Sequence, residues 1–211
     1  MSPHSPESQE SLRGRAEQGD ADAQFELALR YFHGHGVPQD RVEAASWCRR
    51  AAKQGHAEAQ FNLGGMYSGG HGVPQDSVEA ASWCRRAAKQ GHAEAQFNLG
   101  LMYYGGHGVV EDYIKAASWC RKAAEQGDAD AQFYLGLMYD EGHGVPRNRV
   151  EAHMWLSLAA SRATGDDQEE FAAALGEIAE KMPPQQIDEA RRRAGEWRPK
   201  TEQESKPATR K

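Results

Sequence analysis

Two residue types that commonly bind metals recur at one fixed spacing in this chain. A histidine flanked by glycines returns every 36 residues, at His35, His71, His107 and His143. A cysteine follows the same period, at Cys48, Cys84 and Cys120. Imidazole and thiolate are ligands that zinc prefers, so a ladder of metal sites is the first hypothesis that the pattern raises.

The spacing of the histidines argues against that hypothesis. Zinc lies about 2.0–2.1 Å from a nitrogen ligand, whereas equivalent positions on stacked helices are about 8–10 Å apart. Neighbouring histidines of the series therefore cannot share an ion, and His33 with His35 supplies only two ligands. A histidine in a glycine turn is the favoured interpretation, and neither a metal nor another cofactor is expected.

The cysteines raise a second chemical hypothesis, because each stands before two basic residues, as Cys48 does before Arg49 and Arg50. Nearby cations lower a thiol pKa and make the thiol reactive. The alternative, which is favoured, is that the cysteines lie on an apolar helix face and pack as small hydrophobic residues. A spacing of about 8–10 Å also exceeds the roughly 7 Å Cα separation that a disulfide allows. Packing between layers is likewise favoured over ligand stacking for Trp47, Trp83, Trp119 and Trp155.

Composition and motifs exclude further classes. No nucleophile elbow, Ser-x-x-Lys pair, His-Glu-x-x-His motif or phosphate-binding glycine loop occurs, so catalysis has no candidate residue. The net charge of −6 disfavours nucleic acid, and the basic run Arg191-Arg192-Arg193 has acidic neighbours. No apolar segment approaches the roughly 18–20 residues of a membrane span, and no signal peptide is visible. We therefore expect a reduced, cytoplasmic protein, with a monomer favoured.

The elements that must position these residues follow from the repeat itself. A unit of 36 residues is written four times, over about residues 21–56, 57–92, 93–128 and 129–164. A fixed period of about 20–50 residues is typical of a solenoid, in which each unit buries its apolar face against its neighbours. The sequence therefore predicts an all-α solenoid, an architecture whose usual work is to bind other macromolecules.

Each unit is expected to form two antiparallel helices. In the second repeat, Ala59, Leu63 and Met66 have helical spacing, which predicts a helix over about residues 57–68. Gly64 lies inside this helix, where it permits a neighbouring helix to approach closely. A glycine-rich break follows, and the second helix is expected over about residues 78–90.

Caps are predicted at both kinds of helix. An Asp or Asn followed three residues later by Glu predicts a capping box at Asp40/Glu43, Asp76/Glu79 and Asn148/Glu151. The third repeat breaks the box with Lys115. His56 and His92 occupy the position that Asp20 and Asp128 hold before other helices, so we expect them to be weak N-caps.

The solenoid is expected to extend over residues 9–197. Residues 11–20 align with the end of a repeat, and helices are expected at about residues 166–181 and 185–197. The last two form a C-terminal cap over residues 166–197, since a terminal repeat must turn one face to water. Residues 1–8 and 198–211 are polar and are expected to be disordered.

The repeated pattern AEAQFNLGxMYxxGxGVPQDxxEAxxWxRxAAxQG closely resembles the Sel-1-like repeat family over about residues 8–197. That family is a tetratricopeptide-like α/α solenoid, so the resemblance implies a right-handed superhelix of about eleven helices with capping helices at both ends. It further implies a bacterial adaptor, mostly without catalysis, that assembles protein complexes. Two features depart from related patterns. One cysteine or none per repeat differs from the secreted branch, and glutamine replaces the tetratricopeptide tryptophan at Gln24, Gln60, Gln96 and Gln132.

The resemblance also implies where a partner would bind. In the resembling folds, the first helix of each repeat lines a concave face with its positions 2, 5, 9 and 12. Positions 2 and 5 are Asp22, Glu58, Glu94 and Asp130, with Phe25, Phe61, Phe97 and Phe133. Positions 9 and 12 supply Leu29, Leu101 and Leu137, with Phe32, Ser68, Tyr104 and Asp140. An aromatic row edged by carboxylates suits an extended or helical peptide with basic residues. Alternatively, the phenylalanines are half-buried between layers and the acids serve helix N-termini.

The leading functional hypothesis is a non-catalytic protein–protein interaction scaffold. An exported effector that acts on a host remains open, as does an enzyme with an unrecognised site, which is the least favoured. Residues 35–64 and 71–100 are identical except for Arg41 against Ser77. Such near-identity indicates recent duplication or a designed consensus array, and it makes the two central surfaces nearly interchangeable.

Overall fold

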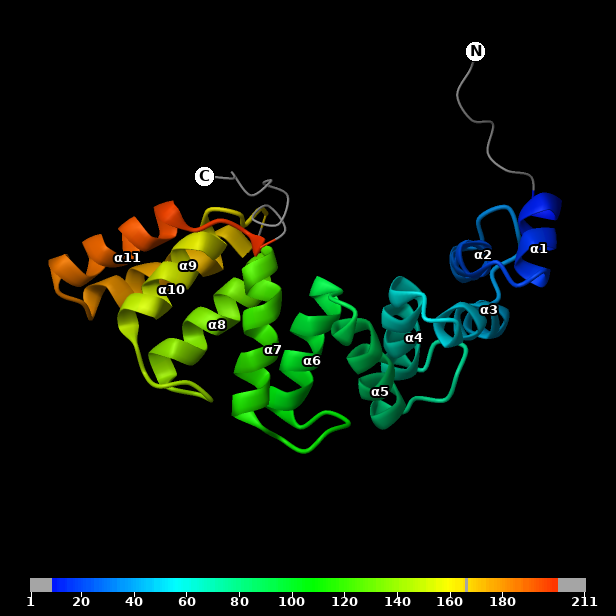
Figure 1. The fold of residues 1–211 in the computed structure, drawn as a ribbon, viewed down its shortest axis with the longest axis horizontal. Helices are drawn as coiled ribbons and strands as arrows, with labels where there is room; N and C mark the ends of the chain where they lie inside the picture. Colours follow the sequence, from blue (N-terminus) through cyan, green and yellow to red (C-terminus); the bar gives the residue numbers. More distant parts are fainter. Residues whose placement is uncertain (1–8, 166, 201–211) are drawn as a thin grey trace, which may run out of the picture. The chain divides into compact units, whose positions relative to one another are not determined.

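A computed structural model describes residues 9–165 and 167–200, and every regular element in those ranges is an α-helix (Figure 1). These helices are α1 Gln9–Glu17, α2 Ala21–His33, α3 Arg41–Lys53, α4 Ala57–Gly69, α5 Ser77–Lys89, α6 Ala93–Gly105, α7 Tyr113–Gln126, α8 Ala129–Glu141, α9 Arg149–Ala160, α10 Asp167–Glu180 and α11 Pro184–Glu196. The all-α prediction is confirmed. None of the described helices is long and apolar enough to cross a bilayer. The disorder predicted for residues 1–8 and 201–211 falls outside the described residues.

The chain divides into two compact units. The first, Met1–Ala95 with His107–Val109, contains α1 to α5, and the second, Gln96–Gly106 with Val110–Lys211, contains most of α6 and all of α7 to α11. In the first unit, α2 packs on α3, α3 on α4 and α4 on α5. In the second, α7 packs on α8 and α8 on α9. Each unit is therefore built from helical hairpins. We call the first helix of each repeat helix A (α2, α4, α6, α8) and the second helix B (α3, α5, α7, α9).

Helix A begins at a side-chain cap and ends at a left-handed glycine. The Nδ1 atoms of His56 and His92 accept the N–H of the third residue of α4 and α6, at 3.1 and 3.2 Å. Asp20 and Asp128 do the same for α2 and α8. At the other end of α4, Gly70 has φ +67° and donates its N–H to a carbonyl of the last turn. The histidine caps predicted from the sequence are confirmed.

Helix B begins at its predicted cap, but the capping box closes on one side only. Asp76 Oδ1 accepts the N–H groups of Val78 and Glu79 at 2.9 and 3.0 Å. The N–H of Asp76 donates to the carbonyl of Tyr67 at 2.9 Å, and the Glu79 carboxylate accepts from Trp83 Nε1 at 3.1 Å. The reciprocal half of the box was therefore a wrong prediction, because the Tyr67 carbonyl in the last turn of α4 already accepts the N–H of Asp76. The Glu79 carboxylate is left to accept from the indole. The first repeat has the same contacts at Asp40, Glu43 and Trp47.

One loop glycine lies directly on the preceding repeat. Gly72 has φ +74°, and a Cβ placed on it would lie 1.8 Å from the carbonyl oxygen of Arg41. Both the left-handed backbone and the close contact require glycine. The same relation, at 1.9 Å, joins Gly108 to Ser77 and Gly144 to Tyr113. Repeat packing therefore accounts for the second glycine of the Gly-His-Gly segments in the second, third and fourth repeats.

The hairpin core combines small residues with buried amides. A Cβ on Gly64 would lie 3.2 Å from the carbonyl oxygen of Ala80, which confirms the close helix approach predicted at this glycine. Gln60 is buried, donates from Nε2 to the carbonyl of Ala52 at 3.0 Å, and accepts from Gln90 Nε2 at 2.8 Å. Glutamine thus fills the place of the tetratricopeptide tryptophan as a hydrogen-bonded link. Equivalent pairs join Gln24 to Gln54 and Gln96 to Gln126.

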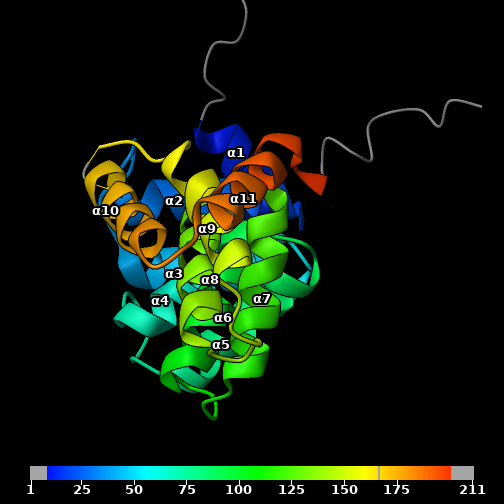
Figure 2. The ribbon, with the colours of Figure 1, turned by 90° about the vertical axis from the view of Figure 1, so that its left-hand side faces the viewer.

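The C-terminal helices enclose the last helix B. Within the second unit, α9 lies between α10 and α11 and packs against both (Figures 1 and 2). The Trp197 ring meets the Trp155 ring at 6.1 Å with an interplanar angle of 72°. Lys200, in the described part of the predicted tail, pairs with Glu125 at the end of α7. These contacts cover the outward side of α9.

Candidate functional site

The residues predicted to bind a partner fall into two groups, one in each unit. In the first unit, Asp22, Glu58, Glu94 and Ser68 are exposed, while Phe25, Leu29, Phe32 and Phe61 are half-buried. In the second unit, Asp130 is exposed, while Phe97, Leu101, Tyr104, Leu137 and Asp140 are half-buried and Phe133 is buried. All of them lie on helix A.

Two acids of the first unit contact the histidine that caps the next helix A. Asp22 Oδ1 lies 3.2 Å from His56 Nε2, and Glu58 Oε2 lies 2.8 Å from His92 Nε2. Since Nδ1 of each histidine accepts a backbone N–H, the neutral ring carries its proton on Nε2. In His92 this N–H donates to Glu58, and in His56 it faces Asp22. The rings also lie 4.8 and 4.7 Å from Phe25 and Phe61. We call Asp22–His56–Phe25 and Glu58–His92–Phe61 layer triads.

The acids and the aromatic residues were predicted from the sequence, but the histidines were not predicted to be their partners. The signal was present, because the first two repeats combine an acid at position 2 with a histidine at the last position, His56 or His92. The third repeat ends in Asp128 instead. Side-chain geometry was needed to show that one imidazole contacts two successive helices A.

A groove opens beside the first layer triad. It has a volume of about 470 Å³ and is lined by Asp22, Phe25, Glu26, Leu29, Arg30, His35 and His56. The Asp22 side chain is 86% exposed despite its contact with His56. Glu26, bonded to Arg30 at 2.6 Å, is 53% exposed. Both carboxylates therefore keep accessible surface beside the apolar side chains of Phe25 and Leu29.

The loop histidines lie against the far end of helix A. The His71 ring is 6.1 Å from the Phe32 ring, and Arg41 Cζ lies 5.8 Å from the same ring. His143 Nδ1 lies 3.3 Å from the Tyr104 hydroxyl. These histidines thus border the predicted face. In the described residues, no three His, Cys, Asp or Glu side chains are grouped as metal ligands.

In the fourth repeat, the chain itself engages two of the predicted contacts. Phe133 is 6% exposed because its ring stacks on Phe171 of α10, with centroids 4.2 Å apart. The Asp140 side chain is 19% exposed and pairs with three cations, Arg149, Arg147 and Lys181, at 3.4 to 3.8 Å. The expectation that these two residues face a partner does not fit this arrangement, because Phe171 of α10 covers one and cations from α9 and the adjoining loops pair with the other.

The remaining acid of the fourth repeat has an unusual environment. Burial raises the pKa of Asp130 above its ordinary value, and the neighbouring charges of Asp128 and Asp167 add to the effect. Its carboxyl therefore holds its proton to higher pH than an isolated aspartate does.

The cysteines are packing residues. Burial raises the pKa of Cys48, Cys84 and Cys120 to about 12 each. The Sγ atoms of Cys48 and Cys84 donate to the carbonyls of Ala59 and Ala95, both at 3.2 Å. All three thiols are free and buried. The packing interpretation is confirmed, and the neighbouring arginines do not activate these thiols.

The helical hairpins, their repeated loops and their glycine contacts define an α/α repeat solenoid. The chain belongs to the Sel1 repeat family, which matches residues 21–56, 57–92, 93–128 and 129–163. Members of this family are generally protein–protein interaction scaffolds. The predicted family and fold class are confirmed.

Solved structures and one curated protein, all bacterial, are similar to this chain. A protective antigen of uropathogenic Escherichia coli with an SLR fold is 36% identical with a TM-score of 0.80, covering 96% of this chain and 44% of that one. A Sel1 repeat protein from Oxalobacter formigenes is 34% identical with a TM-score of 0.73, covering 86% of this chain and 74% of that one. A 42-residue segment is 48% identical to the secretory immunoglobulin A-binding protein EsiB of E. coli O6:H1 (strain CFT073), which is 20% of this chain and 9% of that protein. This chain thus spans less than half the length of both E. coli proteins.

Proposed function

We propose that this chain is a non-catalytic scaffold whose helix A residues bind a peptide segment that carries basic and apolar side chains. The observation that carries the proposal is the groove of about 470 Å³ beside the first layer triad. It combines accessible carboxylates with aromatic and aliphatic surface, which is the chemistry that recognises such a segment. Family membership supports the same class of function.

The layer triads make the aromatic part of the groove rigid. Phe25 lies against His56, and that imidazole is held in turn by a backbone N–H and by Asp22. A phenyl ring fixed in this way loses little conformational freedom when a ligand packs on it. The second layer triad repeats the arrangement, so we propose that Glu58 and Phe61 continue the binding face into the second repeat.

The other predicted positions are assigned by their surroundings. Phe32 and Ser68 are proposed as flanking contacts of the first unit, and Glu94 as a further carboxylate. In the second unit, the proposed contacts are Phe97, Leu101, Tyr104 and Leu137, with Asp130 in a minor role. Phe133 and Asp140 are left out, because Phe171 and three cations cover them.

Selection from a random peptide display library on the immobilised full chain tests the proposal. We expect enriched peptides to combine Lys or Arg with apolar residues and to lose affinity as salt rises, because exposed charges are screened over about 8–10 Å. Asp22→Asn keeps an oxygen for His56 and removes only the charge, so it should weaken binding with the fold intact. Phe25→Ala should accelerate dissociation.

Glu10→Gln on α1 is the matched control, since it removes an exposed charge away from the groove and should change nothing. Selected peptides without basic residues, or equal binding by the Asp22→Asn, Phe25→Ala and Glu10→Gln variants, would contradict the proposed face.

An exported protein that acts on a host protein is a second candidate. It is favoured by the similarity of one segment to a secretory immunoglobulin A-binding protein and of the whole chain to a protective antigen. Cell fractionation of the producing bacterium separates it from a cytoplasmic scaffold. Recovery from the medium together with binding to immobilised secretory immunoglobulin A would favour the exported protein, whereas recovery only from the cytoplasm would favour the scaffold.

A further inference from the structure

The outward side of α9 differs in sequence from that of the other helices B. Where α3, α5 and α7 have serine, α9 has Met154, and where they have a basic residue it has Leu158. In the first three repeats, that basic residue lies over the tryptophan of the same helix, in the pairs Arg50–Trp47, Arg86–Trp83 and Lys122–Trp119, at 4.0 to 4.2 Å. In the fourth repeat, Trp197 lies against Trp155 instead. The apolar substitutions therefore coincide with the place where α11 docks.

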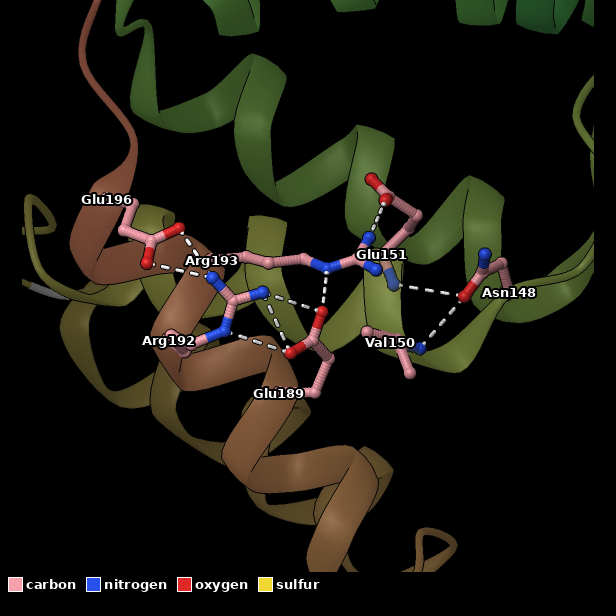
Figure 3. Close-up of polar contacts among 7 residues, drawn as sticks. All are labelled: Asn148, Val150, Glu151, Glu189, Arg192, Arg193 and Glu196. Carbon is pink, nitrogen blue, oxygen red and sulfur yellow. Dashed lines mark hydrogen bonds and ion pairs between the residues drawn. The ribbon is translucent and has the colours of Figure 1, made fainter.

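An ion pair fixes α11 on this side of α9. Arg193 Nη1 lies 2.9 Å from Glu151 Oε1, while its Nε lies 2.6 Å from Glu189 Oε1 on its own helix (Figure 3). The adjacent Arg192 pairs with Glu189 and Glu196, both within α11 (Figure 3). Of these two arginines, Arg193 thus joins the helices and Arg192 bonds only within its own.

In the docked position of α11, the indole N–H of Trp155 has no hydrogen-bond acceptor. In the first two repeats, the glutamate one turn before the tryptophan accepts the indole N–H, as Glu43 does for Trp47 at 3.0 Å. The equivalent Glu151 is occupied by Arg193, and Trp155 Nε1 is buried without a partner. A buried donor without a partner is unfavourable.

A second buried atom without a hydrogen-bond partner, Gln132 Oε1, belongs to the same repeat. Gln24 accepts a hydrogen bond from Gln54 at 2.8 Å, and its equivalent in the fourth repeat is Gln132. Arg162 stands where Gln54 would be, and its guanidinium lies 4.9 Å from the Trp197 ring. Gln132 Oε1 is buried without a partner. In the described residues, two buried side-chain nitrogen or oxygen atoms lack a hydrogen-bond partner, Trp155 Nε1 and Gln132 Oε1. Arg193 of α11 pairs with the glutamate that would accept from Trp155, and Trp197 lies beside the arginine that stands where the partner of Gln132 would be.

Of the described residues of α11, Ala190 is buried, while Ile187 and Ala194 are partly buried against the core. Its N-cap Pro183 provides no side-chain hydrogen bond. We propose that Val150, Met154, Trp155 and Leu158 form a helix-docking site, the α9 face, which α11 fills within the chain and an amphipathic helix of a partner protein fills in its place. The partner helix has an apolar stripe, an arginine that reaches Glu151 and an aromatic residue near its C-terminus. Release of α11 frees Arg162 and exposes the α9 face. This site is separate from the groove on helix A.

A labelled peptide with the sequence of residues 183–200 serves as the probe of this site, and its binding to the full chain is measured by fluorescence anisotropy. In the Arg193→Gln chain, α11 loses its link to Glu151 while Glu151 itself remains, so the probe should bind with a Kd about tenfold lower than in the unchanged chain. Arg192→Gln is the matched control and should leave the Kd unchanged.

A second variant tests the α9 face directly. Met154→Ser with Leu158→Arg gives α9 the residues that α3 and α5 carry at these positions, so the chain should fold, as checked by circular dichroism. It should bind the probe at least about tenfold more weakly than the Arg193→Gln chain does. A scrambled probe should not bind.

Equal probe affinity in the Arg193→Gln and Arg192→Gln chains would overturn the proposal. So would a concentration-dependent dimer of the Arg193→Gln chain in sedimentation velocity, because α11 would then exchange between two copies and the occupant would be this chain itself.

Discussion

His153 is a single buried residue that sets the last repeat apart from the other three. It is 2% exposed, its Nδ1 lies 3.2 Å from the Ser157 hydroxyl, and the other repeats have alanine at this position. Burial lowers its pKa below the ordinary value of 6.5, and the charge of Arg191 adds to the effect. The last repeat therefore contains a titratable group that the folded chain keeps neutral.

This histidine makes stability depend on pH. The unfolded chain binds the proton at a higher pH than the folded chain does, so stability rises with pH between the folded pKa and 6.5. The contribution is complete above 6.5 and is lost as the pH falls below it. We predict that the free energy of urea unfolding falls less between pH 7 and pH 5 in the His153→Leu chain than in the unchanged chain. His33→Gln, at an exposed position, is the control. Parallel profiles for His153→Leu and the unchanged chain would contradict the prediction.

The thiols give a second prediction for single residues. Since Cys48, Cys84 and Cys120 have a pKa of about 12, almost no thiolate exists at pH 8. Iodoacetamide should therefore leave the native chain unlabelled over a period in which it labels all three thiols in urea, as read by intact mass. Rapid labelling of any one cysteine under native conditions would show that its helix B opens locally.

At the scale of elements, the loop glycines distinguish the backbone strain of a substituted side chain from its steric clash with a neighbouring helix. Gly36 and Gly72 have nearly the same backbone, with φ +75° and +74°. A Cβ on Gly36 meets nothing within 4 Å, whereas one on Gly72 would meet the carbonyl oxygen of Arg41 at 1.8 Å. An alanine at position 36 would therefore cause only conformational strain, and an alanine at position 72 would also cause a steric clash.

We predict that Gly36→Ala lowers the free energy of unfolding by about 1 kcal/mol, the strain of a left-handed alanine. Gly72→Ala should cost at least about 3 kcal/mol, because the loop must also move off α3. Urea unfolding followed by circular dichroism measures both. Equal losses at the two positions would mean that the loop of the second repeat does not press on the first.

Periodicity predicted the elements well, because it records which positions are buried. The helices expected over residues 57–68 and 78–90 are α4 and α5. The pair between Gln60 and Gln90 was not predicted, since a hydrogen bond between residues 30 positions apart depends on side-chain geometry. The Glu79 carboxylate was predicted to accept the N–H of Asp76, but it accepts from Trp83 Nε1 instead. The carbonyl of Tyr67, in the preceding helix, accepts the N–H of Asp76. The stacking of Phe133 on Phe171 was not predictable from the sequence, because α10 lies outside the repeats and does not share their period.

At the scale of the whole molecule, the array is made of interchangeable parts. Deletion of residues 57–92 joins His56 to Ala93, and the new junction reads as the old one did because His56 and His92 precede the same sequence Ala-Glu-Ala-Gln-Phe. We predict that this shortened chain folds with unchanged helical content per residue and a lower thermal midpoint, since one repeat interface is lost. Deletion of residues 57–86 removes less of the chain but breaks the repeat, and it should abolish cooperative unfolding. Circular dichroism melts compare the two, and cooperative melting of both would refute the idea that the repeat is the unit of folding.

The identity of these junctions bears on how the chain varies between generations. Unequal recombination between the two matching stretches would add or remove one complete repeat, and every cap, glutamine pair and loop contact at the new seam would be the one already in use. A substitution within a repeat can disrupt folding, whereas the gain or loss of a complete repeat leaves every seam intact. A change in repeat number would therefore alter the length of the array, and with it the thermal midpoint, without disrupting the contacts at any seam.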